Sequence, residues 1–288
     1  MTDGLPAKRI GIGGVVSRTF GAVGANFVTF FLLAILLAAI PAMLLNYGAD
    51  FLRGQLFSQT DVLSAAATGG VLNLAVAAIL MIPSYVLIGA VTQGSIVYYN
   101  GGKANFGDCL STGVRLLLPL VGLGLLTLLG LFLWLLPFAI PVAGLGAAGV
   151  SNPLVIFVVG VLLIIPAILA IIRWSTAAPS LVVERIGVLQ AFRRSADLTR
   201  DNRWAVFFLG LIVIVISVLI QGAISFVALS MVQGFTGSGA GFLLLSIVSI
   251  LYSALNTMIV TCGQAALYFE LRTIKEGATS DELAKVFE

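Results

Sequence analysis

Few side chains of this 288-residue chain could perform catalysis or hold a metal ion. The chain contains no histidine, the usual general base near neutral pH and a common metal ligand. Its two cysteines, Cys109 and Cys262, lie far apart, and neither belongs to a CxxC motif. The acids Glu184, Asp197 and Asp201 alternate with arginines, which favours ion pairs over a catalytic carboxylate pair. We therefore expect no catalytic residues, no metal site, no cofactor and no enzymatic activity.

Arginine is the side chain in this sequence that is best suited to binding. Its planar guanidinium pairs with phosphate through parallel hydrogen bonds, and lipid headgroups supply phosphates where membrane-spanning helices begin. Six arginines near the ends of predicted spans are candidates for contact with lipid headgroups or a partner protein: Arg18, Arg115, Arg193, Arg194, Arg200 and Arg203. The alternative is that these charges only orient the chain during insertion.

A second group of polar residues lies inside the apolar stretches. Ser249, Ser253 and Asn256 share one side of the last predicted helix, Gln264 continues that side, and Gln221 lies in the preceding helix. These residues could line a path for a solute or a lipid. The alternative is hydrogen bonding between helices, which explains most polar residues in membrane spans. No acid or base lies in the middle of a span, which argues against ion-coupled transport.

The elements that carry these residues are predicted from composition. Hydrophobic residues make up 60% of the chain and charged residues 9%, whereas a soluble domain carries roughly 25% charged residues. Several uncharged stretches exceed the roughly 20 residues that a helix needs to cross a bilayer. The prediction is an all-α integral membrane protein with six transmembrane helices, near Asn26–Asn46, Gly70–Tyr98, Leu116–Pro137, Pro153–Arg173, Trp204–Met231 and Gly241–Tyr268.

The basic residues are unevenly distributed about these spans. Fourteen of the 15 lysines and arginines fall on one side, and only Arg53 falls on the other. The positive-inside rule then predicts that both termini lie in the cytoplasm. The net charge of +3 is too small and too dispersed to indicate nucleic-acid binding.

The six spans are predicted to form three parallel hairpin repeats, about residues 11–100, 101–185 and 186–272, with a short cytoplasmic tail or helix at 273–288. Each repeat begins with a cytoplasmic segment patterned as an interfacial amphipathic helix. The clearest of these segments precedes the fifth span. It places the predicted headgroup-binding arginines on one face and Phe192 on the other, which we expect to point toward acyl chains.

Two alignments support the repeat. Asn26 aligns with Asn202 at an offset of 176 residues, each just before a span. The sequence TxGxxxxY begins at Thr92 near the end of the second span and again at Thr261 near the end of the sixth. The alternative is that amphipathic segments and glycine-rich spans arise from composition alone.

One polar connection carries a family pattern, VVE…G…A…RS…LT…W. Its residues are Val182, Val183, Glu184, Gly187, Ala191, Arg194, Ser195, Leu198, Thr199 and Trp204. Together with the segment Asn105–Leu123, the pattern resembles the membrane domain of bacterial glycerophosphoryl diester phosphodiesterases over about residues 100–272. In full-length enzymes of that family a soluble barrel domain holds catalytic histidines and metal-binding acids. This chain has no histidine, so the resemblance implies the membrane part alone, without the catalytic domain or hydrolase activity.

The expected protein is therefore a non-enzymatic, multi-pass protein of the bacterial inner (cytoplasmic) membrane. The absence of catalytic groups favours a lipid-interacting scaffold or an accessory subunit of a membrane complex. Its expected partners are membrane lipids, together with a larger membrane protein complex or further copies of the same chain, and no nucleic acid. The alternative is a permease or lipid carrier with a path between the second, fifth and sixth spans.

Overall fold

The computed structural model describes residues 10–56, 62–147, 167–234 and 239–276, and within these ranges every regular element is a helix. Short helices alternate with long apolar ones along the chain. The labelled helices are α1 (Ile12–Ala25), α2 (Phe27–Ala34), a π-helical segment (Ile35–Ala39), α3 (Ile40–Leu56), α4 (Val62–Tyr99), α5 (Phe106–Arg115), α6 (Leu117–Ala147), α8 (Ala177–Glu184), α9 (Val188–Thr199), α10 (Arg203–Gly234) and α11 (Gly239–Glu276).

Five helical stretches are long and apolar enough to cross a membrane: Phe27–Ala49, Gly69–Tyr99, Ala167–Glu184, Arg203–Val227 and Ile247–Glu276. A sixth is obtained when α5 and the start of α6, which meet at 57°, count as one bent span. The structure thus shows an all-helical chain with five to six candidate spans. The predicted fourth span lies mostly outside the described residues, and its described part continues past its predicted end at Arg173 into α8.

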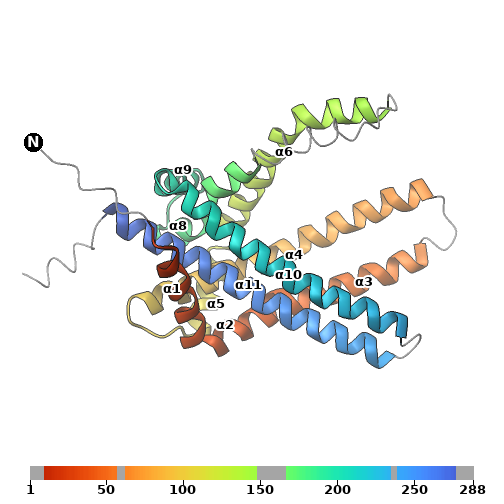
Figure 1. Cartoon of the computed structure of the whole chain (residues 1–288), viewed down its shortest axis with the longest axis horizontal. Coiled ribbons are helices and arrows are strands. Elements are labelled where there is room, and N and C mark those ends of the chain that lie inside the picture. The colour runs from red at the N-terminus through yellow and green to blue at the C-terminus, as the bar shows by residue number, and fades with distance from the viewer. Residues whose placement is uncertain (1–9, 57–61, 148–166, 235–238, 277–288) are drawn as a thin grey trace, which may run out of the picture.

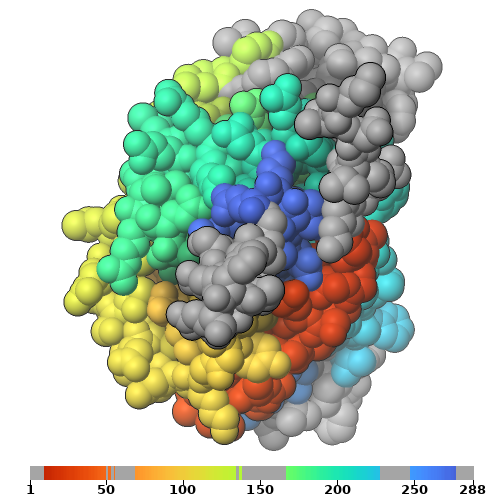
Figure 2. Space-filling view, turned by 90° about the vertical axis from the view of Figure 1, so that its left-hand side faces the viewer, coloured from red at the N-terminus to blue at the C-terminus, as the bar shows by residue number. Residues whose placement is uncertain are grey.

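The helices gather at one end and spread at the other (Figure 1). At the gathered end, which we call the base, α1, α5, α8 and α9 surround the C-terminal end of α11 (Figures 1 and 2). From the base, α3, α4, α10 and α11 extend in one direction, while α6 leads away from them. The base therefore brings together helices from the first, middle and last parts of the chain.

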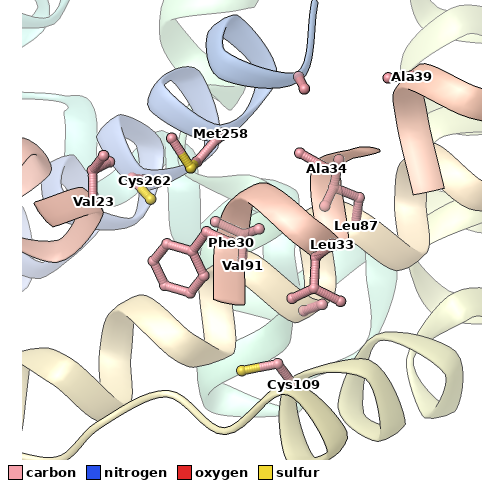
Figure 3. Packing of buried hydrophobic residues seen from close by; sticks show 12 residues of the cluster. Val23, Phe30, Leu33, Ala34, Ala39, Leu87, Val91, Cys109, Met258 and Cys262 are labelled. Atoms are coloured by element: carbon pink, nitrogen blue, oxygen red, sulfur yellow. The ribbon is translucent and has the colours of Figure 1, made fainter. Parts of the chain in front are cut away.

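The largest buried cluster lies where α2 meets α4, α5 and α11 (Figure 3). Phe30 and Leu33 of α2 pack against Leu87 of α4 and Met258 of α11, and all four side chains are fully buried. Packing of this kind replaces the hydrophobic effect as a source of stability between helices in lipid. By contrast, none of residues 207–227 of α10 is buried, so this helix lies at the edge of the bundle.

The breaks between short and long helices are held by asparagine side chains. Asn26 lies between α1 and α2, and its Oδ1 accepts a hydrogen bond from the backbone N–H of Ala104 at 2.9 Å. Asn202 lies between α9 and α10, and its Oδ1 accepts from the backbone N–H of Ile10 at 3.2 Å. Both asparagines are buried, and each satisfies a backbone donor of a segment distant in sequence.

Thr92 and Thr261 are both buried, but their hydroxyl groups differ. Thr261 Oγ1 donates to the carbonyl of Thr257 at 2.8 Å, whereas Thr92 Oγ1 has no hydrogen-bond partner among the described residues. We expect Thr92→Val to raise the free energy of unfolding by roughly 1 kcal/mol, because it removes an unsatisfied buried group. Thr261→Val should lower it by about 0.5–1.5 kcal/mol. Thermal unfolding in detergent measures both, and shifts of the same sign would contradict this account.

Candidate functional site

Four of the six candidate arginines are exposed at the base. Arg115 ends α5, Arg193 lies on α9, and Arg200 and Arg203 flank the break before α10. None of the four forms an ion pair with another described residue. As far as the described residues show, their guanidinium groups could therefore bind an external anion at the level where α6 and α10 begin.

The other two candidate arginines, Arg18 and Arg194, form ion pairs within the protein. Arg18 Nε donates to Glu270 Oε1 at 2.6 Å, and its guanidinium lies 4.8 Å from the centre of the Phe269 ring. Arg194 Nε donates to Glu184 Oε1 at 2.8 Å, and its Nη2 contacts Glu276. These pairs join α1 to α11, and α9 to both α8 and α11.

The electrostatics of Arg194 reflect this double pairing. Burial disfavours its charge, but hydrogen bonds to Glu276 and Glu184 and their negative charges outweigh that effect and raise its pKa. The guanidinium therefore stays charged throughout the physiological pH range. It acts as a fixed cation between two carboxylates and is not a proton donor or acceptor.

The acids of this network were missed as site residues by sequence reasoning. Glu184 also accepts a hydrogen bond from the Tyr268 hydroxyl at 2.8 Å, and Lys275 pairs with Asp201 at 3.1 Å. Among the described ion pairs, only Arg272 with Glu276 has the i, i+4 spacing that a sequence reveals. The alternation of acids and arginines indicated correctly that Glu184 and Asp201 form ion pairs, but Lys275 and Glu276 lie too far away in the chain for a local pattern to identify them as partners.

The environment of α9 differs from the sequence expectation. Its small face, Ala191 and Ser195, is fully buried in the protein, and the Ser195 hydroxyl lies 2.9 Å from that of Thr176. Phe192, which was predicted to point toward acyl chains, is half-buried and packs edge-on against Trp174, with ring centres 5.1 Å apart. The exposed apolar side chain of this helix is Leu189.

An aromatic group lies beside the exposed arginines at the start of α10. Trp204 is 74% exposed, and its ring lies 6.1 Å from that of Phe207 and 6.2 Å from that of Phe208. Tryptophan is enriched at the level of lipid headgroups because its ring is apolar while its N–H can bond to polar groups. Trp204 is therefore a side chain suited to a membrane interface, and it lies next to Arg203 at the start of a candidate span.

A separate polar groove of about 600 Å³ lies between α10 and α11. Its described lining residues are Ser217, Val218, Gln221, Gly222 and Ser225 of α10 and Ser249, Tyr252, Ser253 and Asn256 of α11. The structure thus brings together four of the five predicted path-lining residues, and Gln264 is not among the described lining. No described residue of α4 lines the groove either. The groove is thus formed by the fifth and sixth spans, whereas the path was expected between the second, fifth and sixth spans.

Hydrogen bonds order one end of this groove. Ser217 Oγ donates to Asn256 Oδ1 at 2.8 Å, and the Tyr252 hydroxyl donates to the carbonyl of Ser217, also at 2.8 Å. Farther along, Gln221 Nε2 donates to Ser225 Oγ at 3.4 Å. The groove is therefore a polar strip that connects two otherwise apolar helices.

Metal binding finds no support in the part of the chain that the structure describes. Within it, no three residues among aspartate, glutamate and cysteine are placed to hold a metal ion together. Cys109 and Cys262 are both buried and free.

Comparison with known proteins gives one family match. Residues 148–282 match the family model described as the membrane domain of glycerophosphoryl diester phosphodiesterase. This confirms the resemblance derived from the sequence for the C-terminal part of the chain, including α8 to α11. Neither the curated proteins nor the solved structures include a match to this chain.

Proposed function

We propose that this chain is a non-enzymatic protein of the bacterial inner membrane whose base binds anionic lipid headgroups. In this role it serves as a lipid-interacting scaffold or as an accessory subunit of a larger membrane assembly. The base faces the cytoplasm, together with both termini, because almost all lysines and arginines lie on that side of the spans. The absence of histidine supports the non-enzymatic part of the proposal.

The observation that carries the proposal is the exposure of four arginines at the base that form no ion pair within the described part of the chain. Arg115, Arg193, Arg200 and Arg203 have no acidic partner among the described residues, although other basic residues at the base do. An arginine offers up to five donors in a planar fork, which matches the oxygens of a phosphate. The exposed arginines beside Trp204 are therefore well placed to bind the phosphates of a headgroup layer.

The three short helices α1, α5 and α9 lie in the membrane interface in this proposal. Each leaves a large apolar side chain exposed although its opposite face is packed: Phe20 on α1, Val114 on α5 and Leu189 on α9. Such side chains suit the boundary between headgroups and acyl chains. For α9 this face differs from the one expected from the sequence.

The three helices also belong to three parallel repeats in this proposal, about residues 11–100, 101–185 and 186–272. Each short helix packs against the last helix of another repeat: α5 against α4, α9 against α8, and α1 against α11. The matching roles of Asn26 and Asn202 support the same arrangement. The order is cyclic, because the first repeat closes onto the third.

Headgroup binding is tested with Trp204 as a reporter. In a variant in which Trp134 and Trp174 are replaced by phenylalanine, we expect brominated anionic lipid to quench Trp204 more strongly than brominated phosphatidylcholine. Arg200→Gln together with Arg203→Gln should lower the relative affinity for the anionic lipid about fivefold per arginine, since each basic residue at a membrane surface contributes about 1 kcal/mol. Quenching titrations at fixed ionic strength measure this ratio.

The matched control replaces Arg200 and Arg203 by lysine. Lysine keeps the charge and should keep most of the preference, while losing the paired geometry of the guanidinium. Quenching by brominated phosphatidylcholine should be the same in all variants, which shows that Trp204 has not moved. Equal quenching by both lipids in the reporter protein would contradict the proposed function.

A second candidate function is a carrier that moves lipid. The polar groove between α10 and α11 favours it, because polar groups that face hydrocarbon lower the barrier for a polar headgroup. The groove variants described below provide its test when lipid movement across reconstituted vesicles is followed.

A further inference from the structure

The groove between α10 and α11 lies far from the base along both helices. Ser217 and Ser225 come 14 and 22 residues after Arg203, the first residue of α10. At a rise of about 1.5 Å per residue, these distances are about 21 and 33 Å. The hydrocarbon core is about 30 Å thick. With the base at one interface, the groove therefore runs from beyond the middle of the bilayer to the opposite interface.

The groove presents hydrogen-bonding groups at a depth where they are costly. Gln221 and Ser249 are exposed, on helices whose neighbouring exposed side chains are apolar. A side-chain amide can take part in up to four hydrogen bonds, and the bond from Gln221 to Ser225, at 3.4 Å, lies at the long end of the range. An unsatisfied polar group in hydrocarbon costs several kilocalories per mole, so a polar ligand here would be stabilised.

The chemistry of the lining defines the class of ligand. The described lining contains four serines, a glutamine, an asparagine and a tyrosine, and none of its described residues is charged. Hydroxyl and amide groups both donate and accept hydrogen bonds, as hydroxyl and ester groups of a neutral lipid require. A phosphate would find no cation here, in contrast to the base.

We infer that this groove binds the uncharged, hydroxyl-bearing headgroup region of a diacylglycerol-type lipid from the leaflet remote from the base. Asn256 is placed to donate from its Nδ2 group, because its Oδ1 already accepts from Ser217. Gln221 and Ser249 contact the same headgroup nearer the interface, and the acyl chains lie along the exposed apolar surface of α10. This inference extends the second candidate function by naming its ligand, but it requires binding only and no movement of lipid.

Gly222 provides a variant that fills the groove without disturbing the fold. A Cβ atom at Gly222 meets no other atom within 4 Å, so leucine extends into open space. Gly210 lies on the same helix, is exposed, and also meets nothing within 4 Å, but it does not line the groove. Gly210→Leu is therefore a matched control for helix propensity and for added apolar surface.

The test is photolabelling of the whole protein in phosphatidylcholine nanodiscs. The probe is a diacylglycerol with a diazirine on one acyl chain, close to the glycerol, and labelled peptides are identified by mass spectrometry. We expect saturable labelling of the peptides that contain residues 217–225 and 249–256, with competition by unlabelled diacylglycerol. Gly222→Leu should weaken the apparent affinity about tenfold or more, whereas Gly210→Leu should leave it unchanged.

Three results would overturn the inference. Labelling that does not saturate, or that is equal in both leucine variants, would show that the groove is not a site. Competition by phosphatidic acid as strong as that by diacylglycerol would show that the ligand is not neutral. Absence of lipid labelling at α10 in nanodiscs that hold two copies of the chain would show that a second copy fills the groove. The probe should label the arginine-to-glutamine variants of the base as strongly as the parent protein. A failure of headgroup binding at the base can therefore be distinguished from a failure of the groove site.

Discussion

Replacing Gly113 by alanine is expected to destabilise the protein strongly, although alanine normally favours a helix. A Cβ atom at Gly113 in α5 would lie 2.3 Å from the backbone carbonyl oxygen of Val86 and 3.2 Å from the backbone nitrogen of Ala90, both in α4. Backbone atoms inside a helix cannot move aside alone, so α5 would have to shift away from α4. We expect a loss of about 3 kcal/mol in the free energy of unfolding, the upper end of the usual cost of overpacking.

Gly107 supplies the matched control for this variant. It lies in the same helix, and a Cβ atom there would meet only Asn105 Oδ1, at 3.7 Å. Gly107→Ala should leave the stability unchanged or raise it by up to about 1 kcal/mol through helix propensity. Thermal unfolding of both variants in the same detergent gives the comparison. If Gly113→Ala were as stable as Gly107→Ala, the close contact between α4 and α5 would be wrong.

This contact shows what the sequence could not predict. The amphipathic pattern of α5 predicts a helix there, and the structure has one from Phe106 to Arg115. Gly113, however, is one of 32 glycines, and nothing near it in sequence indicates that it faces Gly89, whose own Cβ position lies 3.0 Å from Gly113 Cα. Close helix contacts of this kind depend on two segments meeting in space.

The long helices were predictable for the opposite reason. Hydropathy is a local property, and the second span, predicted as Gly70–Tyr98, is found as Gly69–Tyr99. The sharing of a helix side by Ser249, Ser253 and Asn256 was predictable too, because it follows from the helical period. The sequence did not predict which helix packs against this side of α11, since α4 and α10 are similarly apolar. The choice of α10 is a result of tertiary packing.

Two adjacent arginines of α9 show the same limit of prediction from the sequence. Arg193 and Arg194 are adjacent and fall within the same polar half of the helix, so the sequence assigned both to lipid headgroups. Consecutive residues point about 100° apart around a helix, which is enough to separate their environments. Arg193 is exposed, whereas Arg194 turns toward Glu184 and toward Glu276, which lies 82 residues away in the chain.

Replacing Arg194 by methionine should therefore destabilise the base, and the same change at Arg193 should not. Arg194→Met leaves two carboxylates, at Glu184 and Glu276, without their shared cation. The side chains of Arg194 and Glu184 are 28% and 19% exposed, so the expected loss is about 2–3 kcal/mol, between the values for surface and for buried ion pairs. Arg193→Met should stay within about 0.5 kcal/mol of the parent.

A third variant tests the cause of that loss. Glu184→Gln in the Arg194→Met background removes one of the stranded charges, so it should recover part of the stability, although Glu184→Gln alone should cost stability. A double-mutant cycle from thermal unfolding gives the coupling energy directly. Purely additive effects would show that Arg194 supports the base by packing and not by charge.

When lipid binding is measured, we expect the replacement of Arg193 to have the larger effect and the replacement of Arg194 the smaller one, the reverse of their effects on stability. Because Arg193 has no acidic partner in the described residues, its replacement should weaken the preference of the protein for anionic lipid about fivefold and leave the fold intact. Arg194→Met, measured below its unfolding temperature, should retain that preference, because the internal acids already occupy the guanidinium. If both variants lost lipid preference equally, Arg194 would have to exchange its carboxylates for headgroups in the membrane. The base would then be a lipid-responsive joint between α8, α9 and α11 and not a fixed support.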